Sequence, residues 1–302
     1  NIFDLPIDIK VGRMEISFGS ERFMSGVGWS NVGRSFDGGL FTLKTGNVKI
    51  DLFTLKEFEK SNAGDSLDQS VYGVNFDIGG IENYKLQPFV IWQRSSPVDL
   101  LSRFSFGTYV KGEHGNFSHE IDAAYQAGKI YSSGRKQTIG AYVLSYNGNY
   151  VFDSPIKPSI GFQIDYTSGD DNGSDDDYNA YSSVYGSGHK FFGNMDYFVN
   201  LVNDTYGLGI MDIIGKVGIN PIEALKLNLN FHIFQSDKDY TLVSGSTSKS
   251  FGSELDFVAN YKYNKIISFE CGASLFMPGD IFKEKRGEDT ASWFYLMAIA
   301  NF

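Results

Sequence analysis

The sequence predicts an all-β fold, namely a transmembrane antiparallel up-and-down β-barrel with about fourteen strands. Three observations predict it. Apolar and polar residues alternate along most of the chain, aromatic residues make up 16 % of the 302 positions, and short turns alternate with long polar connections. The alternation is the period of a strand with one apolar face. The aromatic content and the alternating connection lengths are typical of outer-membrane barrels. We expect a single barrel domain over residues 1–302.

Each expected strand has one apolar and one polar face. Between Leu225 and Ile233, leucine, phenylalanine and isoleucine take the odd positions, whereas Lys226, two asparagines and His232 take the even ones. A helical period is almost absent. The segments with the strand period lie near 7–18, 38–46, 48–58, 70–79, 85–94, 102–112, 117–131, 137–152, 158–168, 206–219, 224–235, 252–263, 266–277 and 291–302.

The connections between these segments alternate in length. The short ones, rich in turn formers, lie at 45–47, 113–116, 153–155 and 263–265, and the long polar ones lie at 19–37, 59–69, 169–205, 236–251 and 278–290. A meander with turns at one end and loops at the other is the pattern of an outer-membrane barrel, in which the short turns face the periplasm. An even strand number then places both termini in the periplasm.

The last segment and the width of the barrel indicate which face meets lipid. Residues Trp293 to Phe302 end in an aromatic residue, in the form of the C-terminal strand that barrel-assembly machinery recognises in Gram-negative outer membranes. A barrel of fourteen strands is difficult to fill with apolar side chains, whereas a polar lumen needs only water. The apolar faces therefore point to lipid and the polar faces to the lumen. Aromatic residues near strand ends, among them Trp92 and Trp293, fit interfacial girdles.

The composition excludes several classes of partner and chemistry. A net charge of −10 argues against nucleic acid, which requires a basic surface. The one cysteine, Cys271, rules out an intrachain disulfide and a cysteine-based zinc site. The four histidines are scattered, and neither H-E-x-x-H nor G-x-S-x-G occurs. We expect no enzymatic activity and no cofactor.

Two separated blocks resemble a known family. The run KVGRMEISFGSER at 10–22 continues to WSNVGRSFDG at 29–38, and together they resemble the block G-R-Q-x-x-x-x-G-x-x-R … W-x-x-x-x-R-x-F-D-G of the alginate-export family of outer-membrane barrels. The segment GHKFFGNMDYF at 188–198 resembles that family's loop G-H-K-x-x-G-x-M-D-x-F. With the terminal strand, the resemblance covers essentially the whole chain. Met14 stands where the family has glutamine, so no pore role carries over to this position.

The resemblance leaves two interpretations of the strand number. Family members generally have about four more strands ahead of the Gly-Arg block, in a barrel of about eighteen. The chain is either a shorter relative that closes on itself with fourteen strands or part of an eighteen-stranded barrel. Because a free strand edge cannot face lipid, we favour the second.

The resemblance also implies passive export of an anionic polysaccharide through an arginine-lined lumen. On the polar faces, eight candidate cations stand against nine candidate anions, without a clear excess: Lys10, Arg13, Lys49, Arg103, Lys111, Lys216, Lys226 and Lys262 against Glu15, Asp51, Asp77, Glu120, Asp122, Asp165, Asp212, Asp256 and Glu270. The sign at the constriction, rather than this sum, decides selectivity. Arginine keeps its charge and can bind a carboxylate through two hydrogen bonds. We expect the constriction to include Arg13, Glu15, Arg22, Arg34, Arg103 and Lys226. The alternative for each arginine is a structural ion pair with a lumen carboxylate, such as Arg13 with Glu15 or with a neighbour across the strand.

The loop at 169–205 is expected to be extracellular or to fold back into the barrel. Its acidic residues Asp171, Asp175 and Asp177 offer the oxygen ligands of a Ca²⁺ site, with a solvated acidic loop as the alternative. The segment 188–198 is too apolar to be left in water. We expect it to enter the mouth or lumen as a gate, with His189, Lys190, Phe191 and Asp196, or to dock a partner protein.

The functional prediction is a passive outer-membrane channel for a polar or anionic solute such as an acidic polysaccharide. The alternative is a non-conducting barrel that serves as a subunit or scaffold of a larger complex. The expected partners are outer-membrane lipid, the solute and other outer-membrane or periplasmic proteins.

Overall fold

The computed structural model describes residues 6–57, 69–95, 100–132 and 134–301. Fourteen strands form one antiparallel meander in which each strand pairs with the next. The strands of this wall are β1 (Ile7–Met14), β2 (Phe36–Thr45), β3 (Val48–Glu57), β4 (Gln69–Ile78), β5 (Tyr84–Ser95), β6 (Leu101–His114), β7 (Phe117–Ser132), β8 (Arg135–Val151), β9 (Ser159–Thr167), β11 (Ile210–Ile222), β12 (Leu225–Thr241), β13 (Thr247–Lys262), β14 (Ile267–Pro278) and β15 (Ala291–Ala300). The predicted strands are confirmed in number, order and type.

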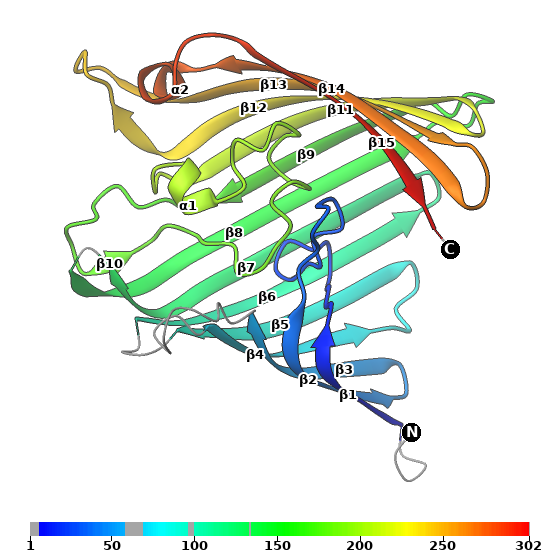
Figure 1. Cartoon of the computed structure of the whole chain (residues 1–302), viewed down its shortest axis with the longest axis horizontal. Helices are drawn as coiled ribbons and strands as arrows, with labels where there is room; N and C mark the ends of the chain where they lie inside the picture. Colours follow the sequence, from blue (N-terminus) through cyan, green and yellow to red (C-terminus); the bar gives the residue numbers. More distant parts are fainter. Residues whose placement is uncertain (1–5, 58–68, 96–99, 133, 302) are drawn as a thin grey trace.

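The wall curves strongly around a central space (Figure 1). The two end strands, β1 and β15, form its two edges and are not hydrogen-bonded to each other in the part of the chain that the structure describes. A fourteen-stranded sheet closed on itself is therefore not observed.

The connections keep the predicted asymmetry. One end of the wall carries only short links, at 46–47, 79–83, 115–116, 152–158, 223–224 and 263–266. The start of β1 and the end of β15 lie at this end, because β1 begins opposite the end of β2 and the amide of Asn301 donates to the carbonyl of Ile266 (3.0 Å). The other end carries the long connections 15–35, 168–209 and 279–290. Part of 59–69, a further predicted loop, lies outside the described residues.

One predicted loop is wrong. Residues 236–251 were expected to form a long connection, but β12 and β13 continue to Thr241 and from Thr247, with register shifts on the way. Serine, threonine, aspartate and lysine fill most of this segment, so it lacks the alternation that marks the rest of the wall. A ladder that projects beyond the lipid needs no apolar face.

The two faces of the wall differ as predicted. Along β12, Leu229, Phe231 and Ile233 are exposed on the outside, whereas His232 is 5 % exposed on the inside. On β15, the outward Phe294 and Leu296 are 69 % and 72 % exposed. A large apolar outer surface of this kind fits a hydrocarbon solvent.

The interior is filled by two connections. The first, 15–35, joins β1 to β2, and the second, 168–209, joins β9 to β11 and contains β10 (Asp177–Tyr178) and α1 (Leu201–Asp204). Both lie inside the curve of the wall (Figure 1). We call these two segments together the plug. The strand β10 pairs in parallel with β8, which ties the plug to the wall at one point.

The buried apolar residues gather where the plug and the connection 279–290 meet the wall. Phe198 of the plug packs on Phe234 of β12, Phe251 of β13 and Phe282 of α2 (Asp280–Lys285), with ring centroids 4.9–5.6 Å apart. These rings are at most 2 % exposed. Where Phe198 meets the wall, the inner face is therefore apolar, which strand period alone does not show.

The short helix α2 also holds the projecting β12–β13 hairpin. The Glu284 carboxylate accepts hydrogen bonds from the amide of Val243 (2.8 Å) and the hydroxyl of Tyr240 (2.7 Å). Both stabilise the ionised form, with the amide contributing most, and they hold the pKa of Glu284 below its usual value.

Candidate functional site

The two halves of the plug are joined by their backbones. The amides of Ser25 and Ser187 donate to the carbonyls of Tyr185 and Glu21, and the amide of Tyr185 donates to the carbonyl of Phe23, all at 2.9–3.0 Å. A Cβ added to Gly186 would lie 2.1 Å from the carbonyl oxygen of Arg22, so this approach requires glycine. The plug is therefore one ordered body made from two distant parts of the sequence.

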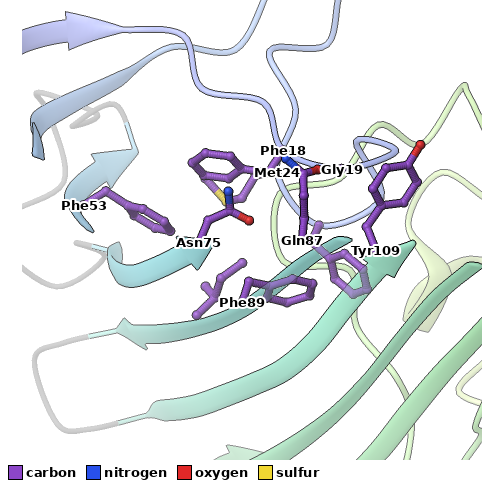
Figure 2. A pocket seen from close by; sticks show the side chains of 10 residues that line it. Phe18, Gly19, Met24, Phe53, Asn75, Gln87, Phe89 and Tyr109 are labelled. Carbon is purple, nitrogen blue, oxygen red and sulfur yellow. The ribbon is translucent and has the colours of Figure 1, made fainter. Parts of the chain in front are cut away.

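The first half docks on β3 to β6 through aromatic rings. Figure 2 shows Phe18 and Met24 of the plug above Phe53, Phe89 and Gln87 of the wall. The ring centroids of Phe18 and Phe53 are 5.5 Å apart. The space that remains is about 10 Å³, which is the size of a single water and too small for a solute.

Arg22 is the ionic anchor of the plug. Its side chain is 4 % exposed, and its guanidinium donates to Asp165 of β9 (2.8 Å) and to the Ser145 hydroxyl of β8 (3.1 Å). Asp122 of β7 lies 3.6 Å away, and the ring of Phe191 lies 3.8 Å below the guanidinium carbon. These groups enclose the guanidinium. Arg22 therefore has the geometry of a structural ion pair, which was the alternative to a role in the constriction.

Two further arginines predicted for the constriction are held by hydrogen bonds, Arg34 within the plug and Arg103 within the wall. Arg34 donates to the carbonyls of Tyr185 (2.5 Å) and Gly186 (3.2 Å), which links the two halves. Arg103 of β6 is 4 % exposed and donates to the amide oxygen of Gln93 (3.1 Å). Among the described residues, no carboxylate lies within ion-pair distance of Arg103.

The placement of Arg13 in the lumen is wrong. Arg13 binds Asp37 through two hydrogen bonds of 2.9 and 2.7 Å. Asp37 neighbours Phe36, which is fully buried inside the wall, so Asp37 and its cross-strand partner Arg13 point outward. Lys10 and Arg13, an even and an odd position of one strand, cannot share a face. The exposed Glu15 lies in the plug beside Gly26 and Gly33. Of the two expected ion-pair partners of Arg13, the structure has the neighbour across the strand, Asp37.

The segment expected to act as a gate lies inside the wall. The ring of His189 stacks on Trp29 at 3.9 Å, and its Nδ1 lies 2.8 Å from the Asp196 carboxylate. Lys190 reaches Glu21 at 3.5 Å, and Phe191 lies against Arg22. The loop is thus held by the other half of the plug.

Two aromatic residues of β15 belong to the same cluster. Trp293 was expected in an interfacial girdle, but it points inward, with Tyr295 stacked on it at 4.7 Å. Tyr295 meets Trp29 edge to face at 4.9 Å. The sequence already indicates the inward direction of Trp293 and Tyr295, because they alternate with Phe294 and Leu296, which point outward.

A buried acidic patch on β11 to β13 was missed as a unit. His232 stands between Asp212 (Nδ1, 2.9 Å) and Asp256 (Nε2, 3.4 Å), and all three are at most 5 % exposed. Glu254 accepts the amide of Met195 at 2.9 Å, so the tip of the plug docks on this patch. The sequence shows these groups on the polar faces, but not that the plug covers them.

The acidic loop shows no assembled metal site. Asp171 and Asp177 are exposed, and Asp175 accepts the side-chain amide of Asn172 and the backbone amide of Asp177 at 3.0 Å each. Within the described ranges, no three acidic, histidine or cysteine side chains converge on a point that could hold a metal ion. The Ca²⁺ site stays a prediction.

A hollow lies between the plug and the short-turn end. It has a volume of about 580 Å³ and is lined by β8, β9 and β11 to β13, the turn 152–158 and one plug residue. Its lining residues are Asn147, Asn149, Val151, Lys157, Ser159, Asn194, Lys216, Val217, Asn220, Lys226, Asn228, Asn230 and Val258. Six are asparagines, three are lysines and none carries a carboxylate. Lys226 is the one predicted constriction residue that lines this hollow.

The comparisons agree with this geometry. The sequence model of a family described as alginate export matches residues 1–295. No curated protein matches the chain. No helix among the described residues is long and apolar enough to cross a membrane.

Solved outer-membrane proteins share the fold. The chain superposes on OccK8 (OprE) of Pseudomonas aeruginosa with a TM-score of 0.60 at 12 % identity, which covers 98 % of this chain and 78 % of that one. For OccAB4 of Acinetobacter baumannii the TM-score is 0.63 at 10 % identity, with 98 % and 72 % covered. For OpdK of P. aeruginosa, whose structure contains vanillate, the TM-score is 0.61 at 10 % identity, with 97 % and 76 % covered.

Proposed function

Because the chain belongs to the alginate export family, we propose that it is a passive outer-membrane channel for polar or anionic solutes such as an acidic polysaccharide. The observation that carries the proposal is the contrast between the two sides of the wall. The outside presents apolar side chains such as Phe294 and Leu296, whereas the inside holds a hydrophilic hollow of about 580 Å³. A wall of this kind suits lipid outside and water inside.

The lining of the hollow favours an anion. Three lysines and six asparagines face it, in a chain whose net charge is −10. Lysines raise the local concentration of anions, and side-chain amides can donate to and accept from hydroxyl groups. A saccharide with carboxylates offers both kinds of group. Diffusion down a gradient needs no cofactor.

The orientation follows from the connections. Short turns face the periplasm in outer-membrane barrels. With the short turns, the start of β1 and the end of β15 at one end of this wall, the termini are periplasmic, the hollow opens toward the periplasm, and the plug lies on the extracellular side.

In this proposal the plug is the gate. The cavity that Arg22 and Phe191 both line measures about 20 Å³, which is too small for a solute. Solute crosses when the segment 188–198, which carries His189, Lys190 and Asp196, moves away from the wall.

The second candidate function is a non-conducting barrel that serves as a subunit or scaffold. The packing of the plug favours it, since Arg22 and Phe198 are at most 4 % exposed. Other outer-membrane or periplasmic proteins would be its partners.

Planar-bilayer recording separates the two. The channel gives steps of current that persist at constant voltage, with a reversal potential in a KCl gradient that shows preference for Cl⁻. A silent protein that retains heat-modifiable migration on a gel supports the scaffold. A preference for K⁺ would exclude the anionic solute.

A further inference from the structure

Lys216 is held differently from Lys44, Lys49 and Lys111 of the inner wall. It lies on β11, half-buried, and its ammonium donates to the side-chain oxygens of Asn147 (3.2 Å) and Gln163. Both acceptors are neutral amides. An ammonium has three donors, so a third donor remains for the hollow that Lys216 lines.

Other lysines on the inner face are neutralised directly. Lys44, Lys49 and Lys111 each lie 2.8–3.0 Å from a carboxylate, of Asp8, Asp51 and Glu113 respectively. Lys216 has no carboxylate within 4 Å among the described residues; Gln163 stands between it and Asp165 and donates to Asp165 at 2.8 Å. The charge of Lys216 is thus held in place by neutral amides, and no carboxylate contacts it directly among the described residues.

The wall beside Lys216 keeps the hollow open. Gly161, its cross-strand partner on β9, carries no side chain, and a Cβ there would lie 3.0–3.1 Å from the carbonyl oxygen of Gly148 and Oδ1 of Asn149. Gly218, two positions along β11, would likewise crowd Ser159 and Asn228. Larger side chains at these two positions would crowd residues that line the hollow, namely Asn149, Ser159 and Asn228.

We infer that Lys216 is the carboxylate-binding group of the hollow, with Asn147 and Gln163 orienting its ammonium and the neighbouring asparagines binding hydroxyl groups. Lys226, which is exposed in the same hollow, adds a second positive charge. The inference rests on the proposed function for its biological meaning and deepens it, because it names the group that recognises the anion. The ligand chemistry is a carboxylate on a polyhydroxylated body.

The test is equilibrium binding to the purified protein in detergent micelles, by calorimetry at 50 mM KCl. The probes are a β-1,4-linked tetraglucuronate, glucuronate itself and the neutral cellotetraose. The Lys216→Gln variant loses a charge-assisted hydrogen bond, so its tetraglucuronate binding weakens about tenfold or more. Cellotetraose binds more weakly than tetraglucuronate in the wild type and is unaffected by the change.

Two variants control the result. Lys44→Gln removes an inner-face lysine that is paired with Asp8 and leaves binding within twofold of the wild type. Lys226→Gln removes an exposed lysine with no structural partner in the described residues and weakens binding about threefold, which keeps the test valid if Lys216→Gln does not fold. Equal binding of the acidic and neutral tetramers, or unchanged acid binding in both Lys216→Gln and Lys226→Gln, overturns the inference.

The probes also separate the two sources of a carboxylate. Glucuronate that binds as tightly as the tetramer, with the same dependence on Lys216, identifies a small free acid; binding of the tetramer alone identifies a polymer. Lys216-dependent binding in a protein that carries no current supports this inference and refutes the channel. Current without Lys216-dependent binding does the opposite.

Discussion

Replacement of Arg22 tests whether the plug is held mainly by its buried charge. The Arg22→Met variant removes the cation that Asp165 meets at 2.8 Å and Asp122 at 3.6 Å, while keeping a side chain of similar length. Both aspartates are at most 3 % exposed, so they would be left as buried, uncompensated charges. Removing one partner of a buried ion pair costs about 3–5 kcal/mol.

This cost falls on the docking of the plug, since the wall keeps its own ladder of hydrogen bonds. Each 1.4 kcal/mol is about a factor of ten in an equilibrium constant. The undocked fraction of the plug therefore rises by about 100-fold to several thousand-fold. Hydrogen exchange measures it at the amides of Ser25, Tyr185 and Ser187, which join the two halves, and the conductance in bilayers rises with it.

The control and the rescue decide how the result is understood. Arg13→Gln removes an exposed arginine that pairs with Asp37 of the wall and leaves exchange at the plug unchanged. Adding Asp122→Asn and Asp165→Asn to Arg22→Met restores slow exchange, because neutral groups no longer need the cation. Plug amides that exchange in Arg22→Met within threefold of their wild-type rates would refute the reasoning.

Three further outcomes are expected. Leu229→Arg, on the outer face, destabilises the protein in lipid vesicles by about 2–4 kcal/mol in urea titrations, whereas the inward Asn230→Arg costs less than 1 kcal/mol; equal costs would contradict the assignment of faces. The folded-state pKa of Glu284 lies below its unfolded value, so the stability that Glu284 contributes is present above the unfolded pKa and is lost as the pH falls through the folded pKa. Hydrogen exchange of the Val243 amide therefore accelerates in that acidic range. In the Glu284→Gln variant this pH dependence disappears. Trp29→Ala removes the ring that stacks on His189 in the other half of the plug, so single-channel recordings show more frequent opening. Unchanged gating would show that the Trp29 ring does not hold the plug closed.

The wall could be predicted from the sequence because its two faces meet different solvents. Lipid on one side and polar contents on the other force each strand to alternate, as Leu229 and Asn230 do. The prediction fails where the two faces of a strand meet the same solvent. Beyond Gln235 the β12–β13 hairpin stands clear of lipid, and its polar residues have the composition of a loop. Arg13 was misplaced for a simpler reason, since its position relative to Lys10 already assigned it to the outer face.

The candidate site was predicted in part. Lys226 was found because it lies on a polar face, and the in-folded segment 188–198 because its rings are too apolar for water. The partners of Arg22 could not be found in this way. Asp165 is 143 positions away along the chain, and local periodicity contains no information about such a contact.

That separation has a consequence for the order in which the molecule assembles. Every pair of neighbouring strands in the wall is joined by a single connection, so hairpins can add one after another at small entropic cost. The bridge between Phe23 and Tyr185 cannot form until more than half of the chain is in place. We therefore expect this protein to assemble in two stages, a fast one that forms the wall around a water-filled lumen and a slower one in which the plug docks inside it. Between them we expect an intermediate that already resists unfolding but conducts freely.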